Sequence, residues 1–209
     1  MDPIASALSW DSASTDNAAA YVGLLHAEAE STLENAVRLL LRNAQAKSQA
    51  FKADPVLLNC VGYYNHQLNT KIARLTMIPK RGDLETDATK LIHCWTSLGA
   101  AEYFESLIAN NHGVGLQYVE RLFHPLGIVV SDKNFKRLSS AGVREVATLV
   151  GSTTMLTEFA LMRGTAVHAG TSEFRGRIQA ESPSAILTRG QGAVRFVEEL
   201  CQTLARRVW

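Results

Sequence analysis

The stretch AAAYVGLLHAEAESTLENAVRLLL, residues 18–41, decides the fold class. Apolar residues recur in it at spacings of three and four or their sums: Tyr21, Leu25, Leu33, Ala36, Val37 and Leu40. This period places them on one face of an α-helix, which we expect to run from about residue 17 to residue 46. Asp16 or Asn17 is the expected N-cap, because a short polar side chain can accept a hydrogen bond from a free amide of the first turn.

Three more long helices are expected from the same spacing, over residues 83–110, 139–167 and 190–208. A weaker helix is expected over residues 54–78, where Asp54–Pro55 combines an N-cap with a first-turn proline. GLQYVERLF (115–123) predicts a short helix, and Ile128–Val130 is the only strand-like run, too short to define a sheet. We therefore expect an all-α fold, an up-and-down bundle of four main helices with additional short helices.

The domain organisation is expected to be simple. Residues 1–17 lack periodicity and predict a flexible lead-in with a docking turn at Trp10, ahead of a single helical domain over residues 18–209. A polar connection is expected between the helices at 139–167 and 190–208. With 209 residues, 46% of them hydrophobic, the chain is long enough to bury one sizeable core.

Charge, cysteine count and hydropathy exclude several classes of protein. The formal net charge is +1, so contacts with nucleic acid must come from a local patch. The three cysteines are far apart and odd in number, which argues against a disulfide framework and indicates a reducing compartment. The N-terminus has no basic stretch followed by an apolar run, and no window approaches about 18 uninterrupted apolar residues. We expect a cytoplasmic protein with no membrane segment.

A polar residue interrupts the apolar face of the helix expected over residues 139–167, in LMRGTAVHAG (161–170). Arg163 follows Phe159 by four residues, so it lies on or beside the core-facing stripe. A guanidinium there must be paired or must line a groove, because an unpaired charge is costly in a dry core. His168 follows five residues later. The plain alternative is that both residues complement the free carbonyls at a helix C-terminus.

The sequence around this pair resembles the HEPN families, most closely the RiboL-PSP-type HEPN domains. Their hallmark is R-x4-6-H near the end of a late helix, and here that stretch is R-G-T-A-V-H-A-G, residues 163–170. Residues 18–41 also look like the first helix of these domains. The resemblance covers residues 18–208 as an architecture, but its specific part is the short motif. The chain departs from the family pattern at Gly164, where many active members carry a polar residue, commonly asparagine.

The resemblance implies a metal-independent endoribonuclease that needs no cofactor and works as a homodimer. When the 2′-OH of RNA attacks the phosphate, one group must accept its proton and another must protonate the leaving 5′-oxygen, and histidine can do either near neutral pH. One chain offers one motif histidine, so a composite site at the dimer interface combines Arg163 and His168 of both chains. Family members often serve in toxin–antitoxin or phage-defence systems, which implies an antitoxin or defence-system partner protein.

Three further residues are candidates for the same site. Glu102 lies on the apolar face of its helix, so it either holds Arg163 or orients His168, pairs with another basic residue, or lies at the edge of the stripe in water. Arg175 and Arg177 follow the motif in EFRGR. They either hold substrate phosphates near the cleft or are simply solvated in a polar loop.

Other types of site lack their sequence signatures. No His and Cys spacing fits a metal site, and GVGLQYVE (113–120) lacks the strand and the third glycine of a phosphate-binding loop. Ser and Cys nucleophile motifs are also absent. Two alternatives to the nuclease stay open: a catalytically inactive helical module that dimerises or binds a partner or nucleotide, and a small-ligand regulatory bundle. Gly164 and the near-neutral charge favour the inactive module.

Overall fold

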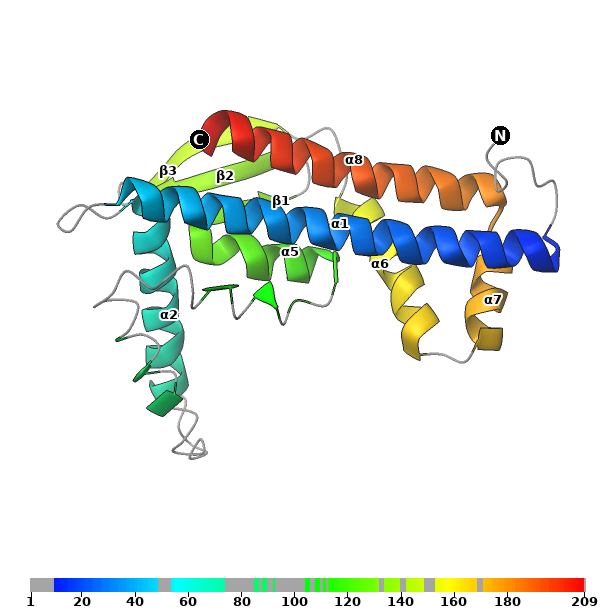
Figure 1. Cartoon of the computed structure of the whole chain (residues 1–209), viewed down its shortest axis with the longest axis horizontal. Helices are drawn as coiled ribbons and strands as arrows, with labels where there is room; N and C mark the ends of the chain where they lie inside the picture. Colours follow the sequence, from blue (N-terminus) through cyan, green and yellow to red (C-terminus); the bar gives the residue numbers. More distant parts are fainter. Residues whose placement is uncertain are drawn as a thin grey trace.

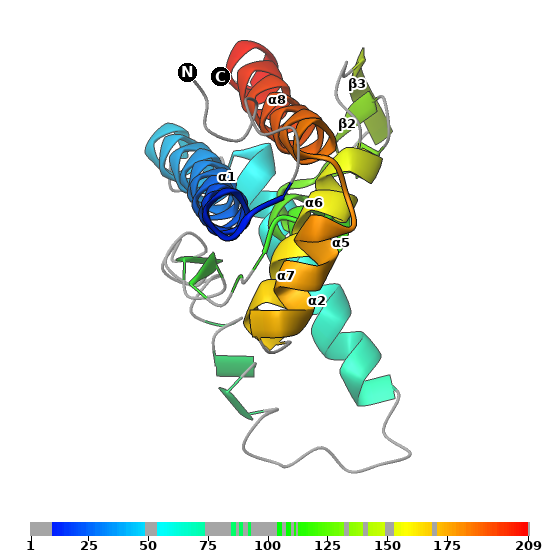
Figure 2. The same cartoon turned by 90° about the vertical axis from the view of Figure 1, so that its right-hand side faces the viewer.

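The structure is a computed structural model that describes residues 10–48, 54–73, 85–86, 88–89, 92, 104–105, 108–109, 111, 113–131, 134–139, 142–148, 153–168 and 171–208. It is mostly helical, which confirms the predicted fold class. Figure 1 shows two long helices, α1 (Ser12–Lys47) and α8 (Pro183–Val208), side by side and running in the same direction. Helices α2 (Pro55–Ala73), α6 (Thr153–His168) and α7 (Thr171–Gln179) extend from one side of this pair (Figures 1 and 2).

Helix α1 begins earlier than the sequence predicts. Its N-cap is Asp11, whose carboxylate accepts a hydrogen bond from the Ser14 amide at 2.7 Å and whose own amide donates to the Ser14 hydroxyl at 2.9 Å. This reciprocal capping satisfies amides that have no partner inside the helix. Asp16 and Asn17 lie inside the helix, so their prediction as caps was wrong. The lead-in is helical from residue 12, and residues 1–9 lie outside the described residues.

The start of α8 is tied to the start of α1. The indole N–H of Trp10 donates a hydrogen bond to the carbonyl oxygen of Glu181 at 2.5 Å, so Trp10 docks as the sequence predicts. Helix α8 begins at Pro183 rather than near residue 190, and the Ser182 hydroxyl caps it by accepting a hydrogen bond from the Ala185 amide at 3.2 Å. A serine before a proline is a helix-start signal, but two glycines inside the helix obscured it.

The segment between α5 and α6 differs most from the prediction. Helix α5 (Leu116–Phe123) was predicted, and a 3-10 turn follows it. The chain then forms a three-stranded antiparallel sheet in the order β1 (Ile128–Ser131), β2 (Asn134–Ser139) and β3 (Gly142–Thr148). The predicted start of a helix at residue 139 was therefore wrong, because α6 begins at Thr153. The pairing of β2 with β3 shifts between Arg137 and Leu138, and this bulge breaks the alternation by which a strand is recognised in sequence.

Helix α7 replaces the predicted polar connection. Only Phe174 and Ile178 of this helix are buried hydrophobic residues, four positions apart, and the rest of its described side chains are polar or exposed. Such a short helix is held by tertiary contact rather than by its own propensity. Of the helix predicted over residues 83–110, the described residues 85–86, 88–89, 92, 104–105 and 108 are helical, and its remaining residues lie outside the described part.

One cluster of buried side chains joins these elements. Helix α1 contributes a continuous stripe at helical spacing: Ala18, Val22, Ala29, Leu33, Val37, Leu40 and Ala44. The largest fully buried side chains are the phenylalanines Phe104, Phe123, Phe159 and Phe196, from four different parts of the chain. Phe159 lies on α6, so this core fixes the face of α6 that carries Arg163. No helix in the described part of the chain is both long and apolar enough to cross a membrane.

Candidate functional site

Arg163 lines a cavity of about 500 Å³ between α1, α6 and the segment that leads into α5. It is larger than two other cavities in the described part of the chain, of about 310 Å³ and about 300 Å³. The polar side chains at its wall come from three helices: His26 from α1, Gln117 and Tyr118 from α5, and Thr157 and Arg163 from α6. The side chain of Arg163 thus borders a cavity large enough for solvent or a small ligand and is not enclosed in the packed core.

No described carboxylate neutralises the charge of Arg163. Its side chain is partly buried, and neither an ion pair nor a hydrogen bond joins it to any described residue. The other arginines whose side chains are described are all engaged. Arg121 stacks over the ring of Tyr118 at 5.3 Å, and carboxylates pair with Arg38, Arg42, Arg175, Arg177, Arg189 and Arg195. A guanidinium that lines a cavity without a protein partner is suited to bind an anion from outside.

His26 lies beside Arg163 and was not singled out from the sequence. The residue is 2% exposed, and its ring stacks on Phe159 with the centroids 6.3 Å apart. The Nδ1 atom is 3.8 Å from Oε2 of Glu30, which is too far for a hydrogen bond. Burial, and then the positive charge of Arg163, lower the pKa of His26 to about 4. The imidazole is therefore neutral near pH 7.

A sequence signal for His26 existed. It follows Val22 by four residues and precedes Ala29 by three, so it interrupts the buried stripe of α1 just as Arg163 interrupts the stripe of α6. The spacing alone does not say which residue it faces, because that depends on how α6 packs against α1. Only the fold brings His26 and Arg163 to the same cavity.

The N-terminal end of α5 adds to the positive potential of the cavity. Gly115 is the N-cap, and no side chain caps this end of the helix. Leu116 and Gln117, the first two residues of α5, both line the cavity. The partial positive charge of the helix dipole therefore lies at the same wall as the guanidinium of Arg163.

His168 is the last residue of α6, five positions after Arg163. Figure 1 shows this end of α6 on the side of α1 opposite to α8. The side chain of His168 and the whole of Glu102 lie outside the described residues. The structure thus establishes the position of the motif at one edge of the molecule.

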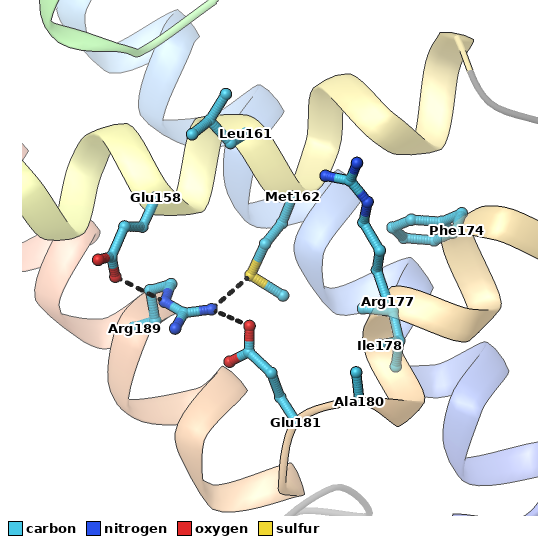
Figure 3. A pocket seen from close by; sticks show the side chains of 9 residues that line it. All are labelled: Glu158, Leu161, Met162, Phe174, Arg177, Ile178, Ala180, Glu181 and Arg189. Carbon is cyan, nitrogen blue, oxygen red and sulfur yellow. Dashed lines mark hydrogen bonds and ion pairs between the residues drawn. The ribbon is translucent and has the colours of Figure 1, made fainter.

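Arg175 and Arg177 lie on α7 and do not line the Arg163 cavity. Arg175 forms an ion pair with Asp16 of α1, which connects the two helices. Arg177 is 59% exposed and lies 3.7 Å from Glu173, one turn earlier. Figure 3 shows Arg177 reaching from α7 toward α6, along the cavity of about 300 Å³ between these helices.

An arginine with two carboxylate partners holds α6 against the start of α8. Arg189 is 3.0 Å from Glu158 of α6 and 2.6 Å from Glu181, and its guanidinium also donates to the sulfur of Met162 at 3.3 Å (Figure 3). Its side chain is 22% exposed. The hydrogen bond that Arg189 donates to the carboxylate of Glu181 raises the pKa of Arg189. These contacts of Arg189 hold α6, the helix that carries Arg163 and His168, against α8.

Within the described part of the chain, no three His, Cys, Asp or Glu side chains are grouped so that they could hold a metal ion. Cys60 and Cys201 form no disulfide within the described part of the chain, and burial raises the pKa of Cys201 to about 11. Searches of known protein families, curated proteins and solved structures found no match to the chain.

Proposed function

We propose that this protein is a metal-independent endoribonuclease of the HEPN type, which acts in the cytoplasm as a homodimer. One observation carries the proposal: Arg163, five residues before His168 on one helix, lines a cavity without a described counter-charge. A phosphodiester is the kind of anion that an arginine in this setting binds, because the planar guanidinium matches two phosphate oxygens.

In the proposed reaction, the 2′-oxygen of a ribose attacks the neighbouring phosphorus, and the bond from phosphorus to the 5′-oxygen breaks. One His168 accepts the proton of the 2′-OH, and His168 of the partner subunit donates a proton to the leaving 5′-oxygen. Arg163 balances the charge on the pentacoordinate phosphate. The products are a 2′,3′-cyclic phosphate and a free 5′-OH. No metal ion or cofactor takes part.

The position of the motif supports a dimeric site. The end of α6 lies away from the α1–α8 pair (Figure 1), at an edge where a second copy of the chain can meet it. Arg177 on the neighbouring α7 is exposed, whereas Arg175 is already paired with Asp16. Arg177 is therefore a better candidate than Arg175 to bind a flanking phosphate of the RNA. Glu102 stays in the proposal as the residue that holds Arg163 or orients His168. A toxin or phage-defence role with an antitoxin partner is the proposed setting.

The test is the cleavage of labelled RNA in EDTA by wild type, Arg163→Ala and His168→Ala. We expect losses in rate of about 100- to 10,000-fold for His168→Ala, which lacks the proton-transfer group, and about 100- to 1000-fold for Arg163→Ala. Arg195→Ala is the matched control, because this arginine is 67% exposed on α8 and pairs with Glu199 of the same helix. Wild-type products must end in cyclic phosphate. A folded wild-type dimer that leaves diverse RNAs intact contradicts the proposal.

A catalytically inactive partner-binding module is the second candidate. Leu161 on α6 is 64% exposed next to the cavity that Met162, Phe174 and Ile178 line between α6 and α7. An exposed leucine beside a cavity with apolar lining offers another protein chain a place to pack. In this case the dimer forms and His168→Ala changes nothing in the RNA assay.

A further inference from the structure

His26 brings unused hydrogen-bonding capacity to the cavity that holds Arg163. Its ring is almost completely buried, yet it lines the cavity, and no hydrogen bond among the described residues involves it. The free ring nitrogens are therefore available to a ligand that enters the cavity.

The two neighbours complement each other chemically. The guanidinium of Arg163 only donates hydrogen bonds, whereas a neutral imidazole offers one acceptor nitrogen and one donor nitrogen. The imidazole stays neutral because the pKa of His26 is about 4. A matching ligand therefore presents an anionic oxygen to Arg163 and a hydroxyl group to His26. A ribonucleotide carries both, a phosphate and a sugar 2′-OH.

The size and the wall of the cavity fit one nucleotide. Its volume of about 500 Å³ lies within the range of small-molecule sites. The ring of Tyr118 lines it, and an aromatic ring can stack on a base of any sequence. The N-terminal end of α5 adds a positive dipole at the same wall.

We propose that His26 is a specificity-determining residue, which accepts a hydrogen bond from the 2′-OH of the ribose on the 3′ side of the phosphate that Arg163 holds. The choice of RNA as ligand rests on the proposed function. The attacking 2′-OH belongs to the preceding nucleotide and is left to His168. His26 therefore transfers no proton in the reaction. It distinguishes ribose from deoxyribose, because only ribose offers this hydroxyl.

A binding experiment tests the assignment without any need for cleavage. Adenosine 5′-monophosphate and its 2′-deoxy counterpart are titrated by calorimetry into wild type, His26→Phe, His26→Gln and Arg163→Ala. Wild type is expected to bind the ribonucleotide about three- to tenfold more tightly, the contribution of one neutral hydrogen bond. His26→Phe keeps a ring against Phe159 and loses the preference, whereas His26→Gln restores part of it. Arg163→Ala weakens both ligands by the same factor.

A cleavage experiment places the contact along the RNA. Once the cleaved bond is mapped, one 2′-deoxy sugar is placed either before or after it. The deoxy sugar before the bond abolishes cleavage by every variant, because it removes the attacking group. The deoxy sugar after the bond slows wild type about three- to tenfold and leaves the rate of His26→Phe unchanged. Thermal unfolding of each variant shows that it is folded.

The outcomes separate this inference from the nuclease proposal. Equal binding of the two nucleotides by wild type, or a ribose preference that persists in folded His26→Phe, overturns the role of His26. If RNA is still cut in a His168-dependent way, the nuclease proposal survives that result. If the protein cuts no RNA but shows a ribose preference that depends on His26, the role of His26 is supported. The nuclease proposal is then contradicted.

Discussion

The charge of Arg163 acts on a neighbouring side chain before any ligand binds. His26 and Arg163 line the same cavity, and the arginine helps to keep the imidazole neutral. Both residues interrupt an apolar helical stripe, so the sequence indicates that each needs a special environment. Arg163 could be predicted as a candidate because a motif surrounds it. His26 could not, because its role depends on a neighbour 137 positions away that only the packing of α1 on α6 supplies.

Stability is expected to depend on pH through His26. Its pKa is about 4 in the folded protein and about 6.5 in the unfolded chain. The unfolded state therefore binds one more proton between these values. The free energy of unfolding falls as the pH drops from about 6.5 to about 4 and levels off below that range. The charged or titratable groups that face this ring are Arg163 from α6, Glu30 from α1 and Tyr118 from α5.

Urea unfolding of wild type and His26→Gln between pH 7.5 and pH 4 measures this contribution. On acidification, wild type is expected to lose up to about 3 kcal/mol more than the variant, which has no titrating ring. Carboxylates titrate in both proteins, so their effect cancels in the difference. A difference that is constant over this pH range contradicts the assignment of a low pKa to His26.

Gly127 is expected to tolerate no side chain. It follows the 3-10 turn with φ of 75°, in the left-handed region, and a Cβ there would collide with the side chain of Asn59 on α2. Gly127→Ala is therefore expected to lower the free energy of unfolding by about 1–3 kcal/mol in urea titrations. Gly176→Ala is the control, because a Cβ on this α7 glycine meets open space. It should raise stability by about 0.5–1 kcal/mol, and equal effects of the two changes would contradict the argument.

Helices α1 and α8 could be predicted because their apolar residues keep one period over many turns. The strands β2 and β3 could not. A bulge breaks the alternation of their side chains, and the valines of β3 at positions 143 and 146 are spaced as in a helix. Helix α7 was missed because its two buried residues give too weak a pattern in nine positions. In each case, contacts between elements decided a conformation that the local sequence leaves open.

The junction of α6 and α8 is expected to depend on Arg189. Arg189→Ala leaves Glu158 and Glu181 without their shared partner, so we expect the free energy of unfolding to fall by about 1–3 kcal/mol. Arg195→Ala on the exposed face of the same helix should cost at most about 0.5 kcal/mol. Urea unfolding of both variants measures the difference. Two equal losses would show that the Arg189 cluster adds no more than an exposed pair.

In the whole molecule, α6 carries Arg163 and His168, and its C-terminal end lies at one edge, on the side of α1 opposite to α8 (Figure 1). This arrangement leaves one copy of Arg163 and His168 per chain, and the proposed chemistry needs two histidines. A dimer is therefore part of the proposed enzyme rather than an accessory. The mostly helical architecture and the place of the motif near the end of a late helix followed from the sequence, whereas the three-stranded sheet did not. The cavity shared by α1, α5 and α6 did not, because three segments far apart in the chain form it.

A mixed dimer tests whether the two chains share one site. Wild type and His168→Ala chains with different tags are co-expressed, and the dimer that carries both tags is isolated. Because each reaction needs an acceptor and a donor of protons, the mixed dimer should retain below about one hundredth of wild-type activity. If each chain had its own independent site, the mixed dimer would keep half. A mixed dimer with half of the wild-type activity would rule out the composite site.

The side-by-side packing of α1 and α8 has a consequence for translation. Ribosomes add about 5–20 residues per second, so α1 leaves the exit tunnel on the order of ten seconds before the residues of α8 are made. During that interval the apolar side of α1 that packs on α8 stays exposed to solvent. Chaperones are expected to recognise this apolar side, and release from them must await the arrival of residues 183–204.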